Sequence, residues 1–156
     1  MSDHAELITR FYQAFAERDG DAMAACYHPE ASFSDPVFPS LRGREPGGMW
    51  RMLTARASDL EVRFSDITSD GDSATAHWDA DYTFAATGRF VKNSIDAKFT
   101  FKDGLIHTHV DDFDFWAWSR QALGVPGLLL GWTPILKNKV RGQAGAQLQK
   151  FMAKHG

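Results

Sequence analysis

The sequence contains one cysteine, Cys26, in 156 residues, so no internal disulfide can form. This residue lies in the segment AMAACY, where we expect a buried, unreactive thiol. Long apolar runs are also missing, since none approaches the ~20 residues that a transmembrane helix needs. The amino-terminal stretch has neither the basic start nor the apolar centre of a secretory signal. These absences predict a cytoplasmic protein.

Motifs for cofactors and for common catalytic groups are missing as well. The chain has no glycine-rich phosphate loop, no serine-histidine-aspartate motif and no CxxC, so we expect no organic cofactor. The formal net charge of −3 and a pI near 6.0 give no reason to expect a nucleic acid partner. A hydrophobic content of 44% is enough for one core, and we expect a single domain over residues 1–156.

The first sixty residues have helical periodicity. Leu7, Phe11 and Phe15 recur every fourth residue, which predicts a helix from Asp3 to about Arg18, capped by Ser2 or Asp3 and stopped by Gly20. A short second helix is expected at 22–27, capped by Asp21 and ended by the His-Pro pair at 28–29. The strand EASFSDPVF, a loop at 41–48 and a third helix at 49–57 follow.

From residue 59 onward the period changes to two, which is typical of strands. Two long hairpins are expected, one turned at Asp70-Gly71 and the other at Asp103-Gly104. The pattern also predicts which side chains of the later strands point inward; these are Ala76, Trp78, Ala80, Tyr82, Phe84, Val91, Ile95, Ala97, Phe99 and Phe101. The whole chain therefore reads as α+β.

The last predicted strand, GLIHTHVDDFDF, has an unusual face. Alternate residues of a strand share a side, so His107, His109, Asp111 and Phe113 are expected together, with Ile106 and Val110 opposite. Residues 119–156 then form a helical extension. Thr133-Pro134 is a good helix start, and the helix that follows is expected to be amphipathic, with Ile135 among its apolar residues.

The order of these elements resembles the nuclear transport factor two-like superfamily, which includes ketosteroid isomerases, SnoaL-like cyclases and scytalone dehydratase. The resemblance rests on RFYQAFAERDGDAMAACYHPEASFSDP and FTFKDGLIHTHVDDFDFW and covers residues 3–118. It implies a cone, in which a curved antiparallel sheet wraps around the N-terminal helices and encloses an apolar pocket. It also implies a homodimer packed through the sheet.

The resemblance suggests three pocket residues. His109 and Asp111 match polar pocket positions of SnoaL-like proteins, and Asp35 aligns with the carboxylate base of ketosteroid isomerases; these isomerases are a standard example of paired acid and base tuning. We expect Asp111 to be a base or its orienter and His109 its proton partner. The alternatives for this pair are a hydrogen-bonded polar layer without chemistry and a position on a solvated dimer face.

The sequence departs from the isomerases at two positions. Their oxyanion tyrosine falls on Phe11, with Tyr12 one residue away, and their neutral acid falls on Ala97. One residue is about 100° around a helix, so Tyr12 need not share the direction of Phe11. Without these two donors a dienolate lacks its oxyanion hole, so steroid isomerisation is not expected.

Other side chains are candidates for ligand contact, and the expected set is Tyr12, Phe38, Trp50, Phe99, Phe101, His107 and Phe113. The spacing of His107, His109 and Asp111 also resembles a metal-binding strand. His77, on another strand, could complete such a site only if it faced inward. It is expected to face outward with Asp79, so we predict no metal.

These observations predict a protein that binds a small hydrophobic carbonyl or polycyclic compound. Whether it also converts that compound, by acid-base isomerase, cyclase or dehydratase chemistry, is left open by the sequence. A non-catalytic ligand-binding or dimerisation module is the alternative. A homodimer is expected because the sheet face around His77 and the segment GLLLGW both need cover. Lys137, Lys139 and Arg141 are expected on the solvated side of the last helix rather than on a membrane.

Overall fold

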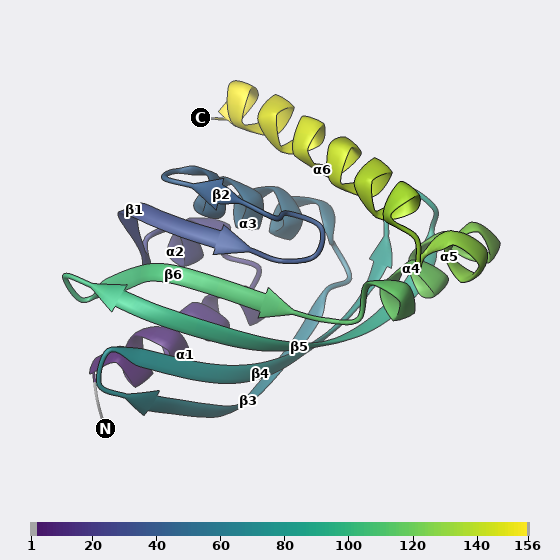
Figure 1. The fold of residues 1–156 in the computed structure, drawn as a ribbon. Helices are drawn as coiled ribbons and strands as arrows, with labels where there is room; N and C mark the ends of the chain where they lie inside the picture. Colours follow the sequence, from purple (N-terminus) through teal and green to yellow (C-terminus); the bar gives the residue numbers. More distant parts are fainter. Residues whose placement is uncertain (1–2, 156) are drawn as a thin grey trace.

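Six strands form one curved sheet around helices in the computed structural model, which describes residues 3–155 (Figure 1). The helices are α1 (Asp3–Ala16), α2 (Gly20–Ala24), α3 (Glu45–Arg56), α4 (Phe115–Leu123), α5 (Val125–Leu130) and α6 (Pro134–His155). The strands are β1 (Tyr27–Ser34), β2 (Leu41–Arg42), β3 (Glu61–Asp70), β4 (Ser73–Phe84), β5 (Arg89–Lys102) and β6 (Leu105–Asp112). The α+β architecture with a carboxyl-terminal helical segment is confirmed.

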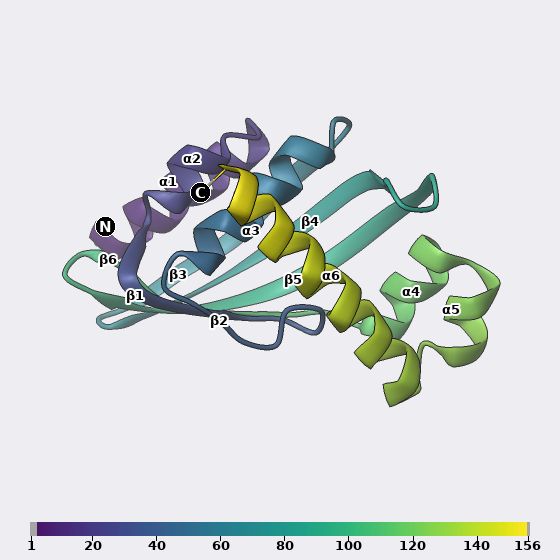
Figure 2. The same ribbon diagram turned by 90° about the horizontal axis from the view of Figure 1, so that it is seen from above.

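The sheet has the order β2-β1-β6-β5-β4-β3, and every pair is antiparallel except β1 with β6. The predicted turns at Asp70-Gly71 and Asp103-Gly104 join β3 to β4 and β5 to β6. Helices α1, α2 and α3 lie on the concave side of the sheet (Figure 2). Strand β6 therefore runs through the middle of the sheet and presents one face to the helices.

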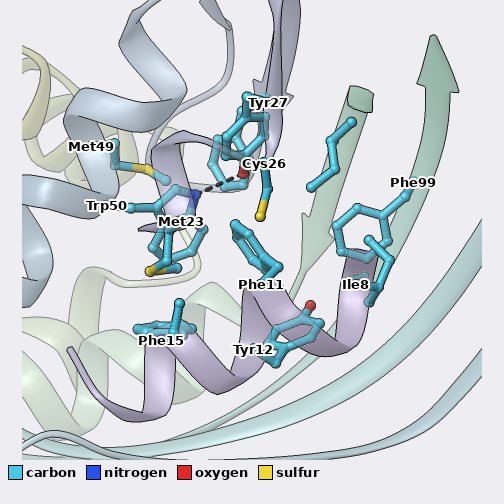
Figure 3. Packing of buried hydrophobic residues seen from close by; sticks show 14 of the residues in the cluster. Ile8, Phe11, Tyr12, Phe15, Met23, Cys26, Tyr27, Met49, Trp50 and Phe99 are labelled. Atoms are coloured by element: carbon cyan, nitrogen blue, oxygen red, sulfur yellow. Dashed lines mark hydrogen bonds between the residues drawn. The ribbon is translucent and has the colours of Figure 1, made fainter. Parts of the chain in front are cut away.

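Helix α1 places its apolar stripe in the core as predicted. Ile8, Phe11 and Tyr12 have no exposed surface and Phe15 is 2% exposed (Figure 3). The helix ends at Ala16, slightly before the predicted end at about Arg18, because Arg18 takes the left-handed conformation with φ 56°. Asp3 is the first residue of α1, and the proposed cap Ser2 lies outside the described residues.

The predicted boundaries around α2 and β1 are wrong. Asp19, not Asp21, caps α2 by accepting a hydrogen bond from the amide of Ala22 at 3.0 Å. Pro29 lies inside β1 instead of ending a helix. The pairing of β1 with β6 is irregular between Tyr27 and Ser32, so the missing amide hydrogen of proline falls in a stretch without regular pairing.

The expected loop at 41–48 is also wrong, because it contains β2 and the first turn of α3. Pro46 lies in the first helical turn, where its missing amide hydrogen costs nothing.

Gly20 explains how α2 and α3 pack so closely. A Cβ atom at Gly20 would lie 2.7 Å from the Cα atom of Arg51 and 2.7 Å from Thr54 Oγ1.

A bulge in β6 changes the facing predicted for that strand. Thr100 pairs with Thr108 and Phe101 pairs with Ile106, so His107 is an extra residue without a partner on β5. The bulge turns Ile106 to the same side as His109 and Asp111, which are 0%, 1% and 3% exposed. His107 therefore does not share the inner face, and Val110 points outward.

The chain after β6 folds as three helices. The segment 125–130 of the predicted helical extension is the short helix α5. Helix α6 passes over α3 (Figure 2), and Arg141 Nε donates to the carbonyl of Pro36 at 2.9 Å. Its inner side carries residues four apart, Val140, Ala144, Leu148 and Met152, of which Leu148 is fully buried. Ile135 is 79% exposed, so the expected apolar stripe does not include it.

We expect Gly127→Ala to lower the free energy of unfolding by about 1–3 kcal/mol or more. A Cβ atom at Gly127 would lie 1.9 Å from the carbonyl oxygen of Ser119, a backbone atom of α4 that cannot move aside easily. Gly142→Ala is the control, since its Cβ atom would meet nothing within 4 Å, and we expect a gain of about 0.4–1 kcal/mol there. Urea unfolding followed by circular dichroism measures both; equal effects would contradict the prediction.

None of the helices within residues 3–155 is long and apolar enough to cross a bilayer.

Candidate active site

A chain of hydrogen bonds inside the sheet links four buried side chains from three elements. Trp50 Nε1 of α3 donates to the hydroxyl of Tyr27 at 2.8 Å (Figure 3). The Tyr27 hydroxyl lies 2.8 Å from Nδ1 of His109, and His109 Nε2 lies 2.7 Å from Oδ1 of Asp111. All four side chains are at most 7% exposed. The two residues of β6 that the sequence singled out are therefore in direct contact.

The donor and acceptor capacities of the four groups determine the direction of each hydrogen bond in this series. An indole nitrogen can only donate, so the Tyr27 oxygen accepts from Trp50 and directs its own hydrogen to Nδ1 of His109. A carboxylate can only accept, so the hydrogen of His109 lies on Nε2 and points to Asp111. The tautomer with its hydrogen on Nε2 satisfies both partners of His109. The chain therefore delivers one hydrogen bond to Oδ1 of Asp111.

His109 is enclosed by aromatic rings. The ring centroids of Phe99 and Phe33 lie 4.2 and 4.9 Å from that of the imidazole, and those of Phe11 and Trp50 lie 5.7 and 6.2 Å away. Both ring nitrogens are already bonded, and the side chain has no exposed surface. His109 is thus held in one orientation and can act on another molecule only through Asp111.

Asp35 supplies a second carboxylate at the end of β1. Its Oδ1 accepts hydrogen bonds from the amides of Val37 at 2.7 Å and Phe38 at 2.5 Å. Burial raises the pKa of Asp35 to about 7, and the negative charge of Asp111 acts in the same direction. The two amides and Arg141 oppose this shift. Asp35 therefore changes its protonation state near neutral pH.

Two buried donors lie in the same interior without partners. The hydroxyl of Tyr12 and Nε1 of Trp78 have no hydrogen-bond partner among the described residues, although both atoms are buried. Their ring centroids are 6.3 Å apart. Burial raises the pKa of Tyr12 well above its usual value and the charge of Asp111 adds to this, so the hydroxyl keeps its proton. An unpaired buried donor is costly unless something else accepts from it.

Comparison with known proteins agrees with this architecture. The model of the SnoaL-like domain matches residues 8–109, which is more than half of the chain. The chain belongs to the SnoaL-like domain family. The matched region runs from α1 to His109, so Asp111 and the helices α4, α5 and α6 lie beyond it. No curated protein matches the chain in sequence.

Solved structures share the fold of this SnoaL-like protein. IdmH from Streptomyces antibioticus, for which a polyketide cyclase activity is proposed, is 25% identical, with a TM-score of 0.62 over 78% of this chain and 99% of its own. An epoxide hydrolase-like protein of M. tuberculosis is 21% identical, with a TM-score of 0.66 over 82% and 96%. A protein of Catenulispora acidiphila with a ketosteroid isomerase-like fold is 17% identical, with a TM-score of 0.68 over 83% and 98%. The nuclear transport factor two-like fold is thus confirmed.

The remaining predicted ligand contacts of this SnoaL-like protein fall in different places. Phe38 and Phe99 are buried in the main core, and Phe113 lies half-buried between the two core clusters. Phe101 is half-buried and stacks on the ring of His4 at 4.0 Å, near the start of α1. His107 lies against His28, with ring centroids 5.9 Å apart, and therefore away from His109 and Asp111.

Three residues of this interior escaped the sequence analysis. Tyr27 was assigned to the end of a helix, although it begins β1 and bonds His109. Trp78 and Tyr82 were assigned to the apolar side of β4 without regard to their polar atoms. The Tyr82 hydroxyl accepts from Nε1 of Trp118 at 2.8 Å, whereas Nε1 of Trp78 stays unpaired. The only feature of the sequence that could have indicated these roles is that Trp78 and Tyr82 each carry a hydrogen-bond donor on an inward face.

Metal ligation by β6 finds no support in the described chain. Among residues 3–155 no three histidine, cysteine, aspartate or glutamate side chains are placed to share an ion, because His107 leaves the inner face at the bulge. His77 faces outward, as expected, and contacts Asp96 at 2.9 Å and Asp79 at 3.3 Å.

Two open surface depressions lie outside the interior site. One is lined by Gly88, Arg89, Phe90, Arg120 and Gln121. The other is lined by Ala24, Tyr27, His28, Pro29, Gly43, Arg44, Gly47 and Arg51. The second thus shares Tyr27 with the hydrogen-bond chain, but no carboxylate lines either depression, so neither is a site of carboxylate chemistry.

Proposed function

We propose that the protein binds a small hydrophobic carbonyl or polycyclic compound inside the cone and converts it by acid-base chemistry without an organic cofactor. The observation that carries this proposal is that the same interior holds two buried carboxylates and two buried donors without partners among the described residues. Asp35 and Asp111 each have Oδ1 tied by hydrogen bonds, while Oδ2 of each accepts none from the described residues. Tyr12 and Trp78 supply the donors.

These groups suit proton abstraction next to a carbonyl. A carboxylate takes the proton from the carbon beside the carbonyl, and the electron pair of that C–H bond moves to the carbonyl oxygen as an enolate. The Tyr12 hydroxyl and Trp78 Nε1 donate to this oxygen and stabilise its charge. Return of the proton to another carbon completes an isomerisation. In a dehydration the carboxylic acid gives the proton to a hydroxyl group on the neighbouring carbon, which leaves as water while the enolate electron pair re-forms the carbonyl and a C=C bond.

We assign the proton transfer to the two carboxylates rather than to the imidazole. Asp35 has a pKa of about 7, which suits a group that both takes and returns a proton at neutral pH. Asp111 is oriented by His109, and His109 is a positioning residue because its two nitrogens are occupied. The activity proposed for IdmH, a polyketide cyclase, points to the same substrate class of polycyclic carbonyl compounds.

Asp111→Asn is expected to lower turnover by about 100-fold or more, because the amide keeps the shape of the side chain and removes its charge. The measurement is conversion of a panel of enones, cyclic ketones and aromatic polyketide analogues, with the fold checked by circular dichroism. Asp112→Asn is the matched control, since Asp112 is the exposed neighbour on the outer face of β6 and should retain full turnover. Equal turnover of both variants on every substrate would contradict the proposal.

A non-catalytic ligand-binding module is the second candidate, and one observation favours it. His109 is packed against aromatic rings and fully bonded, as expected of a polar layer in a core. In that case Asp111→Asn changes the affinity for a ligand, and no compound in the panel is converted by the wild-type protein. The homodimer and the cytoplasmic location expected from the sequence stay predictions and belong to both candidates.

A further inference from the structure

An exposed apolar surface lies beyond one end of the sheet, where α4, α5 and the start of α6 meet. Ten large hydrophobic side chains are exposed among the described residues, and seven of them fall in this segment. They are Trp116, Val125, Leu128, Leu129, Leu130, Trp132 and Ile135. We call these seven residues the apolar corner. In Figure 1, α5 projects beyond the sheet at the end far from the amino terminus.

The apolar corner is exposed to a degree that ordinary surfaces rarely show. Leu129 is 61% exposed, Trp132 74% and Ile135 79%. A contiguous apolar surface of this kind marks contact with a protein or with lipid. The corner is also firmly built, because Gly127 brings α5 against the backbone of α4.

Backbone carbonyls of the apolar corner accept hydrogen bonds from side chains of the protein itself. Helix α5 ends with three consecutive carbonyl groups that lack helical partners. Trp116 Nε1 donates to the carbonyl of Leu128 at 3.1 Å, Trp132 Nε1 to that of Leu129 at 3.0 Å, and the Thr133 hydroxyl to that of Leu130 at 2.5 Å. Polar groups that are satisfied within the protein can enter an apolar medium without a desolvation penalty.

The carboxyl-terminal segment has only basic charged side chains, although the exposed Asp114, which caps α4, directly precedes it. Residues 115–156 contain no aspartate or glutamate and six lysine or arginine residues, Arg120, Lys137, Lys139, Arg141, Lys150 and Lys154. Residues 1–114 hold all 20 acidic residues of the chain and the other 11 basic ones. The carboxyl-terminal segment thus carries +6 and the rest −9. An anionic surface would attract the corner and repel the body of the protein.

We propose that the apolar corner docks on an anionic lipid surface, with Leu129, Trp132 and Ile135 inserted among the lipids and Lys137 and Lys139 at the headgroups. An apolar helical face bordered by cations is the usual form of interfacial binding. Symmetric pairing of two copies through the corner would bring two segments of +6 together, which favours lipid over a second copy. This inference does not depend on the activity inside the cone, and surface docking needs no membrane-spanning helix. It replaces two expectations from the sequence, that Lys137 and Lys139 face only solvent and that the segment GLLLGW is covered by a second copy.

The experiment is co-sedimentation of the full chain with vesicles of phosphatidylcholine alone or with 30% phosphatidylserine. We expect at least tenfold tighter binding to the anionic vesicles and loss of most of it in 0.5 M salt. The double variant Leu129→Glu/Ile135→Glu should bind at least tenfold more weakly, and Lys137→Gln/Lys139→Gln about fivefold more weakly. Val110→Glu is the matched control, because Val110 is 45% exposed on the outer face of the sheet and should bind like the wild type.

Other results would overturn the proposal. Equal binding to both vesicles would remove the role of charge, and equal loss in the control Val110→Glu would remove the role of the corner. Sedimentation velocity without lipid tests the competing occupant. Dimers that dissociate in the Leu129→Glu/Ile135→Glu variant, together with no vesicle binding by the wild type, would assign the corner to a second copy. Circular dichroism verifies that each variant is folded.

Discussion

Replacing His109 by alanine is expected to lower the free energy of unfolding by about 3–5 kcal/mol, because it leaves the buried carboxylate of Asp111 without its donor. The Asp111 side chain is 2% exposed, so water cannot replace the lost hydrogen bond. The same change empties the space between Phe33 and Phe99, where the imidazole ring packs. Urea unfolding of the purified variant measures the loss.

A double-mutant cycle separates the hydrogen bond from the cavity. The change of both residues, His109→Ala with Asp111→Ala, should cost clearly less than the sum of the single changes, since no charge is left unpaired. His77→Ala is the surface control, because His77 contacts Asp96 on the outer face and its loss should cost less than about 1 kcal/mol. A cost below about 1 kcal/mol for His109→Ala would mean that the buried pair is not formed.

Asp35→Asn is expected to stabilise the protein at pH 8 by about 2–4 kcal/mol, since a shift of one pKa unit corresponds to about 1.4 kcal/mol. Burial raises the pKa of Asp35 from 3.8 to about 7. Between these values the folded state holds a proton that the unfolded state has lost, so the wild-type stability falls as the pH rises through this window. Asparagine avoids the cost of the buried charge and can still accept from Phe38.

The pH dependence is the sharper part of this prediction. The stability difference between Asp35→Asn and wild type should be small at pH 4, grow from pH 4 to 7 and stay constant above. Asp59→Asn serves as the control of opposite sign, because the hydrogen bonds from Thr83 lower the pKa of Asp59. Its contribution is present above pH 4 and is lost as the pH falls below. A constant difference for Asp35→Asn across pH 4–8 would contradict a raised pKa.

Periodicity predicted most of the fold because the side chains of α1, β4 and β5 obey it without exception. Phe11 and Trp78 are buried where the pattern places them, and His77 faces outward. The pattern failed at β6, because a bulge adds one residue and reverses the facing of everything on one side of it. His107 was therefore placed beside His109, and Val110 beside Ile106. No local residue preference marks the bulge.

The candidate site was only partly predictable for a similar reason. His109 and Asp111 lie two apart on one strand, so their contact follows from strand geometry alone. The partner of His109 on the other side, Tyr27, lies 82 residues away in sequence and reaches it through the parallel pairing of β1 with β6. Long-range pairing of this kind cannot be read from spacing. The raised pKa of Asp35 likewise depends on Asp111 and on burial, both properties of the folded chain.

The parallel pairing of β1 with β6 also governs how the protein can be made. Ser32 and Thr108 are neighbours in the sheet, so β1 leaves the ribosome long before the strand that must lie beside it. Until residues 105–112 emerge, the aromatic side of α1 has no imidazole layer to pack on, and β1 presents an unpaired edge. Contacts this distant in sequence form slowly. The edge of β1 therefore stays unpaired, and open to wrong pairing, for much of the time that the chain takes to be made.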